Sequence, residues 1–475
     1  MSDNYINADI CVIGAGSGGL SVAAGASQMG ANVVLLERGK MGGDCLNHGC
    51  VPSKALLAAG NKAEAFRTSG AFGIGTMVPK VDFAKVNEHV HSVIAAIEPN
   101  DSVERFEGLG VRVIQEVGTF VGPREVKAGE HTINAKYFVI ATGSSAGLPS
   151  IQGLSATPYL TNETIFDLKK CPEHLVVIGG GPVGCELAQA HRRLGARVTV
   201  LEISTILAND DREAANVVRL QLRREGVELH EGVEIQGVEG SEGEISVTLN
   251  VDGQTRNIEG SHLLVAVGRT PNVTGLGLEA AGIQYSEKGI QIDARLRTSN
   301  KRVFAIGDVS GAFQFTHVAG YHASIVIRNA LFKLPAKADY CAVSWVNFTD
   351  PELAHVGLSE MQAKEALGDD IRILRWPFAE NDRAQAERRT DGFIKVIADR
   401  KGRIHGVCVV GANAGELIFP WALAVQKRLK VGAIASVIAP YPTMSEVSKR
   451  ATGTFFTPSL FSERTKKLVR FLMNF

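Results

Sequence analysis

The sequence predicts an α/β fold with two parallel-sheet domains and a C-terminal α+β domain. Two distant segments each follow the order strand, glycine turn, helix, strand, and the residues after 343 combine strand patterns with helical ones. At 475 residues the chain is also too long for one small core. Lysine plus arginine (50) equals aspartate plus glutamate (50), which argues against nucleic acid as a partner and favours a small molecule or a protein.

The first unit is "ADICVIGAGSGGLSVAAGASQMGANVVLLERG". An apolar strand ends in Gly14, Gly16 and Gly19, a helix of small residues follows, and a second apolar strand leads to Glu37. Glycines let the backbone turn tightly and approach a pyrophosphate at the helix N-terminus, while the acid can accept hydrogen bonds from ribose hydroxyls. The unit therefore predicts a dinucleotide site.

The second unit, "HLVVIGGGPVGCELAQAHRRLGARVTVLEIS", repeats this pattern. It contains Gly179, Gly181 and Gly184 and leads to Glu202, and its first glycine and its acid are 23 positions apart, as in the first unit. Such repetition of motif, strands and spacing predicts two Rossmann-like dinucleotide-binding domains.

The acid of the second unit also bears on the choice of nicotinamide cofactor. A carboxylate at Glu202 suits a free 2′-hydroxyl and repels a 2′-phosphate, and "ISTILA" after it supplies no arginine to hold one. We therefore expect NADH rather than NADPH.

Two cysteines five positions apart follow the first unit, in "GGDCLNHGCVPSK". A zinc site at Cys45 and Cys50 would need two more ligands, and no nearby pair supplies them at metal spacing, so we expect no metal. No apolar run approaches bilayer length and no signal-peptide pattern is present, so we expect a cytoplasmic protein, in which a close cysteine pair is more often catalytic or metal-binding than structural. A helix start and Lys54 are close enough to lower a thiol pKa, which favours a redox pair.

Further motifs accompany these units. They are "ATGS" at 141–144, "VGRTPN" at 267–272, "VFAIGDV" at 303–309 and "FTDPELAHVGLSE" at 348–360. With them the chain resembles, over nearly its whole length, the class I pyridine nucleotide-disulfide oxidoreductase family, in its dihydrolipoamide dehydrogenase-like and mercuric reductase-like branch.

The resemblance implies that the first unit binds FAD, that the second binds the nicotinamide cofactor, and that electrons pass from NADH through FAD to a Cys45–Cys50 disulfide. Cys50 corresponds to the thiol beside the flavin and Cys45 to the thiol that exchanges with substrate. Lys54 and Glu186 match the family's ion pair beside the flavin, although a helix-surface acid is the alternative for Glu186. The cofactor-binding positions implied are Gly14, Gly16, Gly19, Glu37, Lys54, Thr142, Gly143, Asp308, Gly179, Gly181, Gly184, Glu202, Gly268 and Arg269.

The stretch "APYPTMSEVSKRA" departs from the family. Disulfide-reducing members carry a histidine there, with a glutamate five residues later, as a base for the substrate thiol; here Tyr441 and Glu446 hold these places. A free phenol titrates about 3.5 pH units above imidazole, so it is a poor thiol base at neutral pH. Loss of a general base typically costs about 10²- to 10⁴-fold, which argues against lipoamide as the physiological substrate. If a helix has begun at Cys45, His48 is a candidate substitute base.

Efficient mercury reduction is also not expected. Mercuric reductases resemble this chain in the tyrosine but end in an adjacent cysteine pair, which "TKKLVRFLMNF" lacks. We expect Cys341 and Cys408, in apolar contexts, to belong to the core.

The expected organisation has four segments. Residues 1–152 form the first part of the FAD-binding domain with the redox disulfide, 153–272 the NAD(P)-binding domain, 273–342 the second part of the FAD-binding or central domain, and 343–475 a dimerisation domain with an amphipathic tail. "GEISVTLNVDG" predicts a hairpin, and "FIKVIADRKGRIHGVCVVG" predicts two strands around a turn. A homodimer would place Tyr441 and Glu446 of one subunit over Cys45 of the other.

The tail "SLFSERTKKLVRFLMNF" places apolar residues near helical spacing beside four basic ones. It could rest on a membrane surface, but we expect it to pack against the dimer.

The leading hypothesis is a homodimeric enzyme that oxidises NADH and reduces a disulfide, metal or other small acceptor through its cysteine pair. The alternatives are a genuine dihydrolipoamide dehydrogenase with a replacement base, a flavin-only diaphorase or quinone reductase, and a non-catalytic scaffold that keeps FAD for folding.

Overall fold

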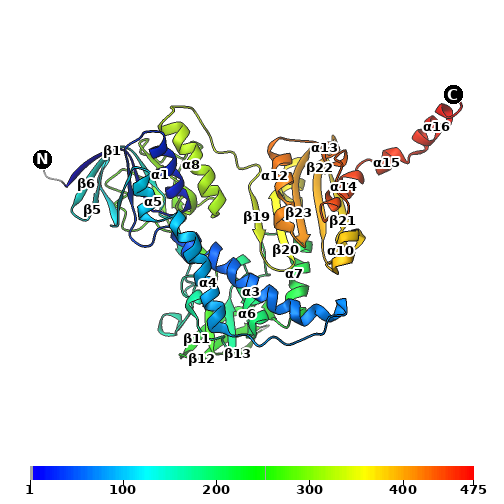
Figure 1. Ribbon diagram of the computed structural model, residues 1–475, viewed down its shortest axis with the longest axis horizontal. Coiled ribbons are helices and arrows are strands. Elements are labelled where there is room, and N and C mark those ends of the chain that lie inside the picture. The colour runs from blue at the N-terminus through cyan, green and yellow to red at the C-terminus, as the bar shows by residue number, and fades with distance from the viewer. Residues whose placement is uncertain (1–3, 252) are drawn as a thin grey trace. The chain divides into compact units, whose positions relative to one another are not determined.

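The computed structural model describes residues 4–251 and 253–475 (Figure 1). The chain divides into two compact units: unit 1 comprises Met1–Gly179, Arg193–Thr199 and Glu234–Ala338, and unit 2 comprises Gly180–Arg192, Val200–Val233 and Asp339–Phe475. Both combine helices with sheets, and the predicted α/β class is confirmed. Among the described residues, no helix is both long enough and apolar enough to cross a membrane.

Unit 1 is built on a seven-stranded sheet. Its order is β3 (Val111–Ile114), β2 (Val33–Leu36), β1 (Tyr5–Ile13), β6 (His131–Ile140), β5 (Glu125–Ala128) and β4 (Gly118–Gly122), with β18 (Val303–Ala305) also paired to β6. Strand β1 runs parallel to β2 and β6. Because successive side chains of a strand point to opposite faces, Ile10 and Val12 join one core while Cys11 and Ile13 join another.

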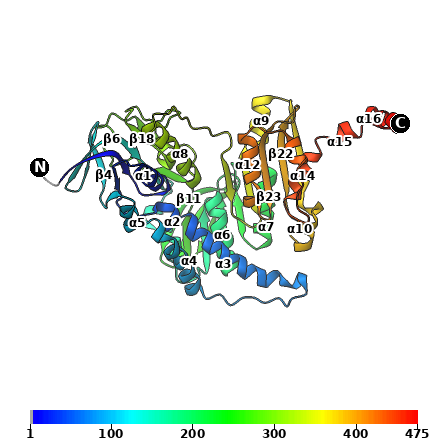
Figure 2. The ribbon, with the colours of Figure 1, turned by 45° about the horizontal axis from the view of Figure 1, so that its top comes forward.

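The helices of unit 1 precede and follow these strands. They are α1 (Ser17–Gln28), α2 (Gly43–Asn47), α3 (Cys50–Thr68), α4 (Phe83–Ile97), α5 (Val103–Gly108) and α8 (Thr316–Ala330). Helices α1 and α8 lie side by side (Figures 1 and 2). Leu20 and Val22 of α1 and Ile325 of α8 are buried in the same core as Ile10 and Val12.

Smaller sheets complete unit 1. Strand β8 (His174–Ile178) pairs in parallel with β14 (His262–Val265), and β7 (Ser144–Ala146) pairs antiparallel with β15 (Arg269–Pro271). Strands β11 (Glu234–Ser241), β12 (Glu244–Val251) and β13 (Gln254–Gly260) form an antiparallel sheet, which confirms the predicted hairpin. Strands β16 (Tyr285–Ser286) and β17 (Gly289–Ile290) form a short ribbon.

Unit 2 contains a five-stranded antiparallel sheet. Its order is β19 (Ser344–Asn347), β20 (Glu352–Gly357), β23 (Ile404–Gly411), β22 (Phe393–Asp399) and β21 (Ile371–Pro377), and the β22–β23 pair confirms the predicted strands around a turn. Its other elements are α7 (Arg212–Arg224), β10 (Glu228–Glu231), α9 (Glu360–Leu367), α10 (Asp382–Glu387), α11 (Ala414–Leu417), α12 (Phe419–Gln426), α13 (Val431–Ala435), α14 (Glu446–Gly453), α15 (Thr457–Leu460) and α16 (Glu463–Leu472). The chain crosses between the units within α6 (Pro182–Leu194) and within β9 (Arg197–Glu202).

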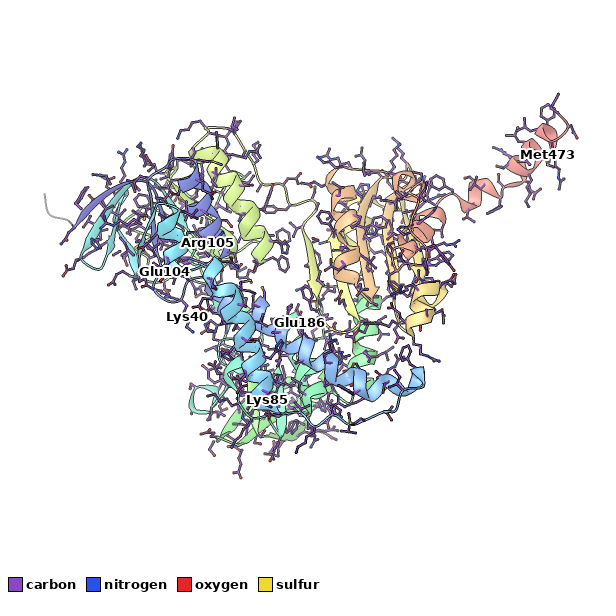
Figure 3. All side chains as sticks on the ribbon, in the orientation of Figure 1. Lys40, Lys85, Glu104, Arg105, Glu186 and Met473 are labelled. Carbon is purple, nitrogen blue, oxygen red and sulfur yellow. The ribbon has the colours of Figure 1, made fainter. Side chains whose placement is uncertain are left out.

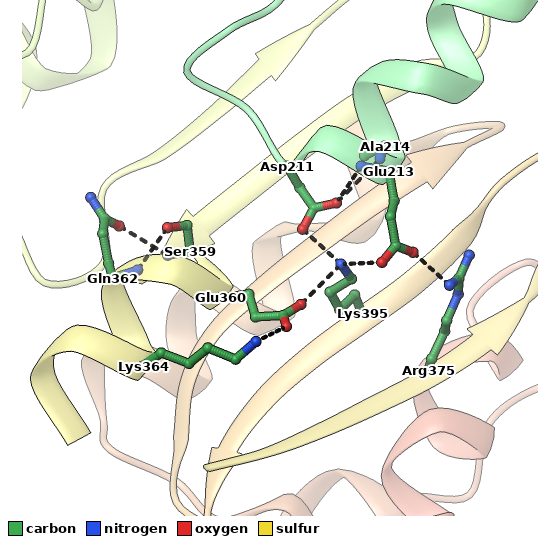
Figure 4. Close-up of polar contacts among 9 residues, drawn as sticks. All are labelled: Asp211, Glu213, Ala214, Ser359, Glu360, Gln362, Lys364, Arg375 and Lys395. Atoms are coloured by element: carbon green, nitrogen blue, oxygen red, sulfur yellow. Dashed lines mark hydrogen bonds and ion pairs between the residues drawn. The ribbon is translucent and has the colours of Figure 1, made fainter. Parts of the chain in front are cut away.

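A buried lysine joins three segments of unit 2. The ammonium of Lys395 on β22 lies 2.8 Å from Asp211, 3.2 Å from Glu213 and 3.3 Å from Glu360, and its side chain is 3% exposed (Figure 4). Asp211 also caps α7, since its carboxylate accepts hydrogen bonds from the first turn. We call Asp211, Glu213, Glu360 and Lys395 the Lys395 cluster.

The two cysteines expected in the core differ. Cys408 is buried in β23, as predicted, whereas the prediction for Cys341 is wrong: this residue is exposed in a turn just before β19. The apolar residues around Cys341 in the sequence do not form a continuous strand there, so the local pattern misled the assignment.

Candidate active site

The predicted redox pair lies where two helices meet. Cys45 is on the short helix α2, and Cys50 is the first residue of α3, after Gly49 as the N-cap. Helix α2 ends at Asn47, and His48 is its C-cap with φ −140° and ψ 3°, so the helix does not continue through His48. The helix therefore includes Cys45 but ends just before His48, and the role of His48 as a substitute base stays a prediction.

The two thiols have opposite pKa shifts. A hydrogen bond from Cys45 lowers the pKa of Cys50 to about 6, against the opposing effect of burial, and the Thr316 hydroxyl and Lys54 lower it further. The Thr316 Oγ1 and the Cys50 Sγ are 3.4 Å apart. The same hydrogen bond, together with burial, raises the pKa of Cys45. The reduced pair therefore holds one proton, on Cys45, with the negative charge on Cys50.

The position of Cys50 suits this charge. It is the first residue of a 19-residue helix whose N-cap offers no side-chain cap, so it lies at the positive end of the helix dipole. Lys54 lies one turn further along α3, and its ammonium donates to the Ser53 hydroxyl at 3.2 Å. The helix start and the lysine that were predicted to lower a thiol pKa are therefore both present in unit 1.

Glu186 lies in unit 2, on α6. Its carboxylate accepts a hydrogen bond from the backbone N–H of Phe348 at 2.9 Å, and the side chain is buried. The alternative interpretation of Glu186 as a helix-surface acid is therefore wrong.

The "ATGS" and "VGRTPN" motifs meet in unit 1. Strand β7 from the first pairs with β15 from the second, and the Thr142 hydroxyl donates to the Asn272 carbonyl at 2.8 Å. The carbonyl of Gly143 accepts from the Asn272 N–H at 3.0 Å, and that of Gly268 from the Gly147 N–H at 2.8 Å.

A polar cluster forms around Arg269. It contains Arg269 and Asp308, which the sequence predicted as cofactor-binding residues, and Asp44 and Ser144, which it did not. The Arg269 guanidinium donates to the Ser144 hydroxyl at 2.7 Å and lies 3.3 Å from Asp44 and 3.8 Å from Asp308. The Ser144 hydroxyl donates to Asp308 at 2.6 Å. Burial raises the pKa of Asp308, partly offset by Ser144 and Arg269. We call Asp44, Ser144, Arg269 and Asp308 the Arg269 cluster.

Asp44 connects this cluster to the redox pair. It directly precedes Cys45, its second oxygen accepts from the Asn162 amide at 3.0 Å, and its charge opposes ionisation of both thiols. Sequence reasoning missed Asp44, Asn162, Ser144 and Thr316, although Asp44 stands inside the quoted redox stretch and Ser144 inside "ATGS".

The first glycine turn has the geometry that a pyrophosphate needs. Gly14 has φ +105°, and a Cβ there would lie 2.4 Å from the carbonyl oxygen of Ala141, so the turn requires glycine. Gly16 is the N-cap of α1 with no side-chain cap, which leaves the first N–H groups of the helix available to an anion. Gly19 packs with its Cα against the Gly14 carbonyl. Glu37 follows β2 and accepts the Ala15 N–H at 2.6 Å, close to the turn. These residues fit FAD.

The second glycine turn repeats this geometry. Gly179 has φ +108°, and a Cβ there would lie 2.4 Å from the carbonyl oxygen of Ala266. In unit 2, Glu202 at the end of β9 accepts the Gly180 N–H at 2.7 Å and the Ser204 N–H at 2.9 Å. Gly181 has free space where a side chain would be, and Gly184 is buried in the first turn of α6. This turn fits a second dinucleotide.

Tyr441 and Glu446 are near each other in unit 2. The Tyr441 hydroxyl donates to Asp382 at 3.0 Å, and this hydrogen bond, with the charges of Asp382 and Glu446, raises the pKa of the phenol. Glu446 is the first residue of α14. Tyr441 is 70% exposed, so a partner could reach it.

The described part of the chain contains no cluster of side chains arranged to bind a metal ion. Within residues 4–251 and 253–475, no group of three or more histidine, cysteine, aspartate and glutamate side chains is arranged to hold a metal ion.

Comparisons with known proteins agree with this geometry. Residues 8–323 match the family described as pyridine nucleotide-disulphide oxidoreductase, and residues 343–452 match its dimerisation domain. A mercuric reductase from Bacillus cereus is 37% identical over 451 residues, which cover 94% of this chain and 71% of that protein. A dihydrolipoyl dehydrogenase from Geobacillus stearothermophilus is 36% identical over 460 residues, covering 95% and 97%.

The solved structures lead to the same family. The HOCl-induced flavoprotein disulfide reductase RclA from Escherichia coli superimposes with a TM-score of 0.83 at 26% identity, covering 94% of this chain and 99% of that one. This family binds FAD and uses a nicotinamide dinucleotide. The predicted resemblance is confirmed: the chain is a flavin-dependent oxidoreductase of the pyridine nucleotide-disulphide oxidoreductase family.

Proposed function

We propose that this enzyme uses NADH to reduce a disulfide, a metal ion or another small acceptor through Cys45 and Cys50. FAD, when bound, supplies the two-electron link between the nicotinamide and sulfur. Per turnover, NADH becomes NAD⁺, and its hydride reduces the Cys45–Cys50 bond to one thiol and one thiolate.

The observation that carries this proposal is the placement of Cys45 on α2 beside Cys50 at the start of α3, where the Cys45 thiol and the Thr316 hydroxyl lower the pKa of Cys50. With a disulfide acceptor, Cys45 attacks one substrate sulfur as its proton passes to Cys50, and the first substrate thiolate leaves. Cys50 then attacks the Cys45 sulfur, restores the internal disulfide and releases the second substrate thiolate, which takes up the proton that Cys50 held. We further propose that Lys54 and Glu186 form an ion pair beside the cofactor.

An anaerobic titration with NADH tests the route. The flavin-loaded wild-type protein is expected to accept two electron pairs per subunit, one on the flavin and one on the disulfide. Replacing Cys45 with serine should reduce uptake to one pair and abolish acceptor turnover, whereas Cys341→Ser, at an exposed cysteine outside the pair, should change neither. Wild-type uptake of one pair, or full turnover by the Cys45 variant, would instead identify a flavin-only diaphorase.

A second candidate is dihydrolipoamide dehydrogenase. It is favoured by the near-complete coverage of the Geobacillus enzyme, but the raised pKa of Tyr441 makes this phenol a weak base for a substrate thiol. Metal ions stay among the proposed acceptors because relatives include mercuric reductases and a Cu(II) complex of RclA.

We also propose how the enzyme assembles, how its chain divides into domains and where it is located. The dimerisation-domain match supports a homodimer in which Tyr441 and Glu446 of one subunit lie over Cys45 of the other. The four segments 1–152, 153–272, 273–342 and 343–475 are the proposed domain parts, and we propose a cytoplasmic enzyme.

A further inference from the structure

The segment after residue 452 has no assigned role. The family's dimerisation domain ends at residue 452, whereas helices α15 and α16 follow it. The segment is attached to unit 2 through Phe455, because the Arg372 guanidinium lies 4.7 Å from the centre of its ring and donates to its carbonyl at 3.1 Å. From Thr457 onward, the structure describes every residue, and none is buried.

Helix α16 has one apolar and one basic face. Its side chains repeat every 3.6 residues, so Leu468, Phe471 and Leu472 share a face with Val469 at its edge and Arg464 at its first turn, and Phe475 follows just after the helix. The opposite face carries three basic residues, Lys466, Lys467 and Arg470. The apolar residues are exposed, for example Leu468 at 56%, Leu472 at 57% and Phe475 at 95%. Figure 3 shows Met473, 80% exposed, on the last turn of this segment.

The helix is stabilised locally. Ser462 is its N-cap and accepts the Thr465 N–H at 3.3 Å, and the Thr465 hydroxyl donates back to the Ser459 carbonyl at 2.7 Å. The rings of Phe471 and Phe475 meet edge to face with centroids 5.2 Å apart. These contacts all lie within residues 459–475 and hold the helix that carries the two faces.

We propose that α16 lies on the surface of a bilayer that contains anionic lipid. Exposed apolar side chains between flanking lysines match an interfacial helix, in which apolar groups enter the headgroup boundary and lysine stems reach back to water. The one acidic side chain of the helix, Glu463, is already paired with Lys466 at 2.8 Å, so the helix as a whole is basic. At ten residues, about 15 Å, it can lie on a bilayer but not cross one.

Charge also argues against a second copy of α16 as the occupant. Two such helices packed through their apolar faces would bury Arg464, which stands four positions before Leu468 and so lies on that face. The segment lies beyond the matched dimerisation domain as well. The proposal therefore replaces our expectation that the tail packs against the dimer.

Sedimentation of the full-length, flavin-loaded protein with vesicles tests the proposal. Vesicles of phosphatidylcholine with phosphatidylglycerol are compared with phosphatidylcholine alone, and we expect pelleting with the first kind only, decreasing as salt is raised. The variant Lys466→Gln/Lys467→Gln/Arg470→Gln should bind roughly 100-fold more weakly, since each basic residue near the surface contributes about fivefold. The variant Leu468→Ser/Leu472→Ser should also lose binding.

A matched control removes three exposed cations elsewhere. Lys80→Gln/Lys85→Gln/Lys127→Gln makes the same change in net charge outside the tail and should pellet as the wild type does. Oxidation of NADH by all variants checks that they are folded. If the wild type does not pellet, or the tail variants pellet as it does, the proposal is overturned. It is equally overturned if Leu468→Ser/Leu472→Ser converts dimers to monomers in light scattering while vesicle binding is absent.

Discussion

At the residue scale, Cys50 is the centre of the proposed chemistry because several groups stabilise its charge together. A hydrogen bond from Cys45, the Thr316 hydroxyl and the ammonium of Lys54 outweigh the cost of burial, so its pKa falls to about 6. The thiolate is therefore present at neutral pH and is lost as the pH falls through about 6.

Replacing Thr316 with valine tests this assignment. Loss of a hydrogen bond to a charged group is expected to raise the Cys50 pKa by roughly one pH unit or more. The pH dependence of the long-wavelength thiolate band of the reduced, flavin-loaded enzyme measures the shift. Thr316→Ser keeps the hydroxyl and should titrate like the wild type; an unchanged midpoint in the valine variant would remove Thr316 from the account.

Tyr441 is the second residue whose protonation state matters for the proposed reaction. Its phenol donates to Asp382 and has a raised pKa, so it does not accept a proton from a substrate thiol at neutral pH. Tyr441→His is expected to raise the rate of dihydrolipoamide oxidation by at least roughly 100-fold, the usual contribution of a general base. Tyr441→Phe should leave this rate unchanged. Loss of dihydrolipoamide oxidation in the phenylalanine variant would instead make the phenol a participant in that reaction.

At the scale of elements, the same strand–turn–helix–strand unit occurs twice with nearly the same geometry. The leading glycines have φ +105° and +108°, and the closing acids accept backbone N–H groups at 2.6 and 2.7 Å. Because the two units are so similar, the same substitution in the first unit is a control for a substitution in the second.

The nicotinamide preference can be tested with this control. Glu202→Gln keeps the acceptor for Gly180 and removes the negative charge, so the preference of kcat/KM for NADH over NADPH should fall by at least roughly tenfold, because a like charge beside a phosphate is unfavourable. Glu37→Gln, in the first unit, should leave this ratio unchanged in flavin-loaded protein. Equal use of both cofactors by the wild type would contradict the proposal.

At the scale of the whole molecule, ion pairs between residues far apart in the chain stabilise unit 2. The Lys395 cluster joins α7, α9 and β22 (Figure 4). Burial by itself lowers the pKa of Lys395, but Asp211 and Glu213 outweigh it and raise the pKa. Stabilisation by Lys395 is therefore present below its unfolded pKa and is lost only as the pH rises through the raised folded value.

Lys395→Met is expected to destabilise the protein by about 3–5 kcal/mol, because it leaves the buried Asp211 carboxylate without a cation. Lys364→Met removes an exposed partner of Glu360 and should cost less than about 1 kcal/mol. Denaturant unfolding measures both. Lys364 and Lys395 lower the pKa of Glu360, so its contribution is lost as the pH falls through that folded value, and the difference between Lys395→Met and wild type should shrink in acid. Similar stabilities of the two variants at neutral pH would contradict this.

The sequence by itself determined the two glycine units, the redox pair and the departure at Tyr441. Each depends on residues within one short stretch, where backbone preference and spacing are local properties. Only the tertiary structure brought Asp44, Ser144, Arg269 and Asp308 together, set Thr316 beside Cys50, and left Cys341 exposed. The partners in these contacts come from segments up to 266 positions apart. Their proximity follows from how strands and helices pack, which no local pattern encodes.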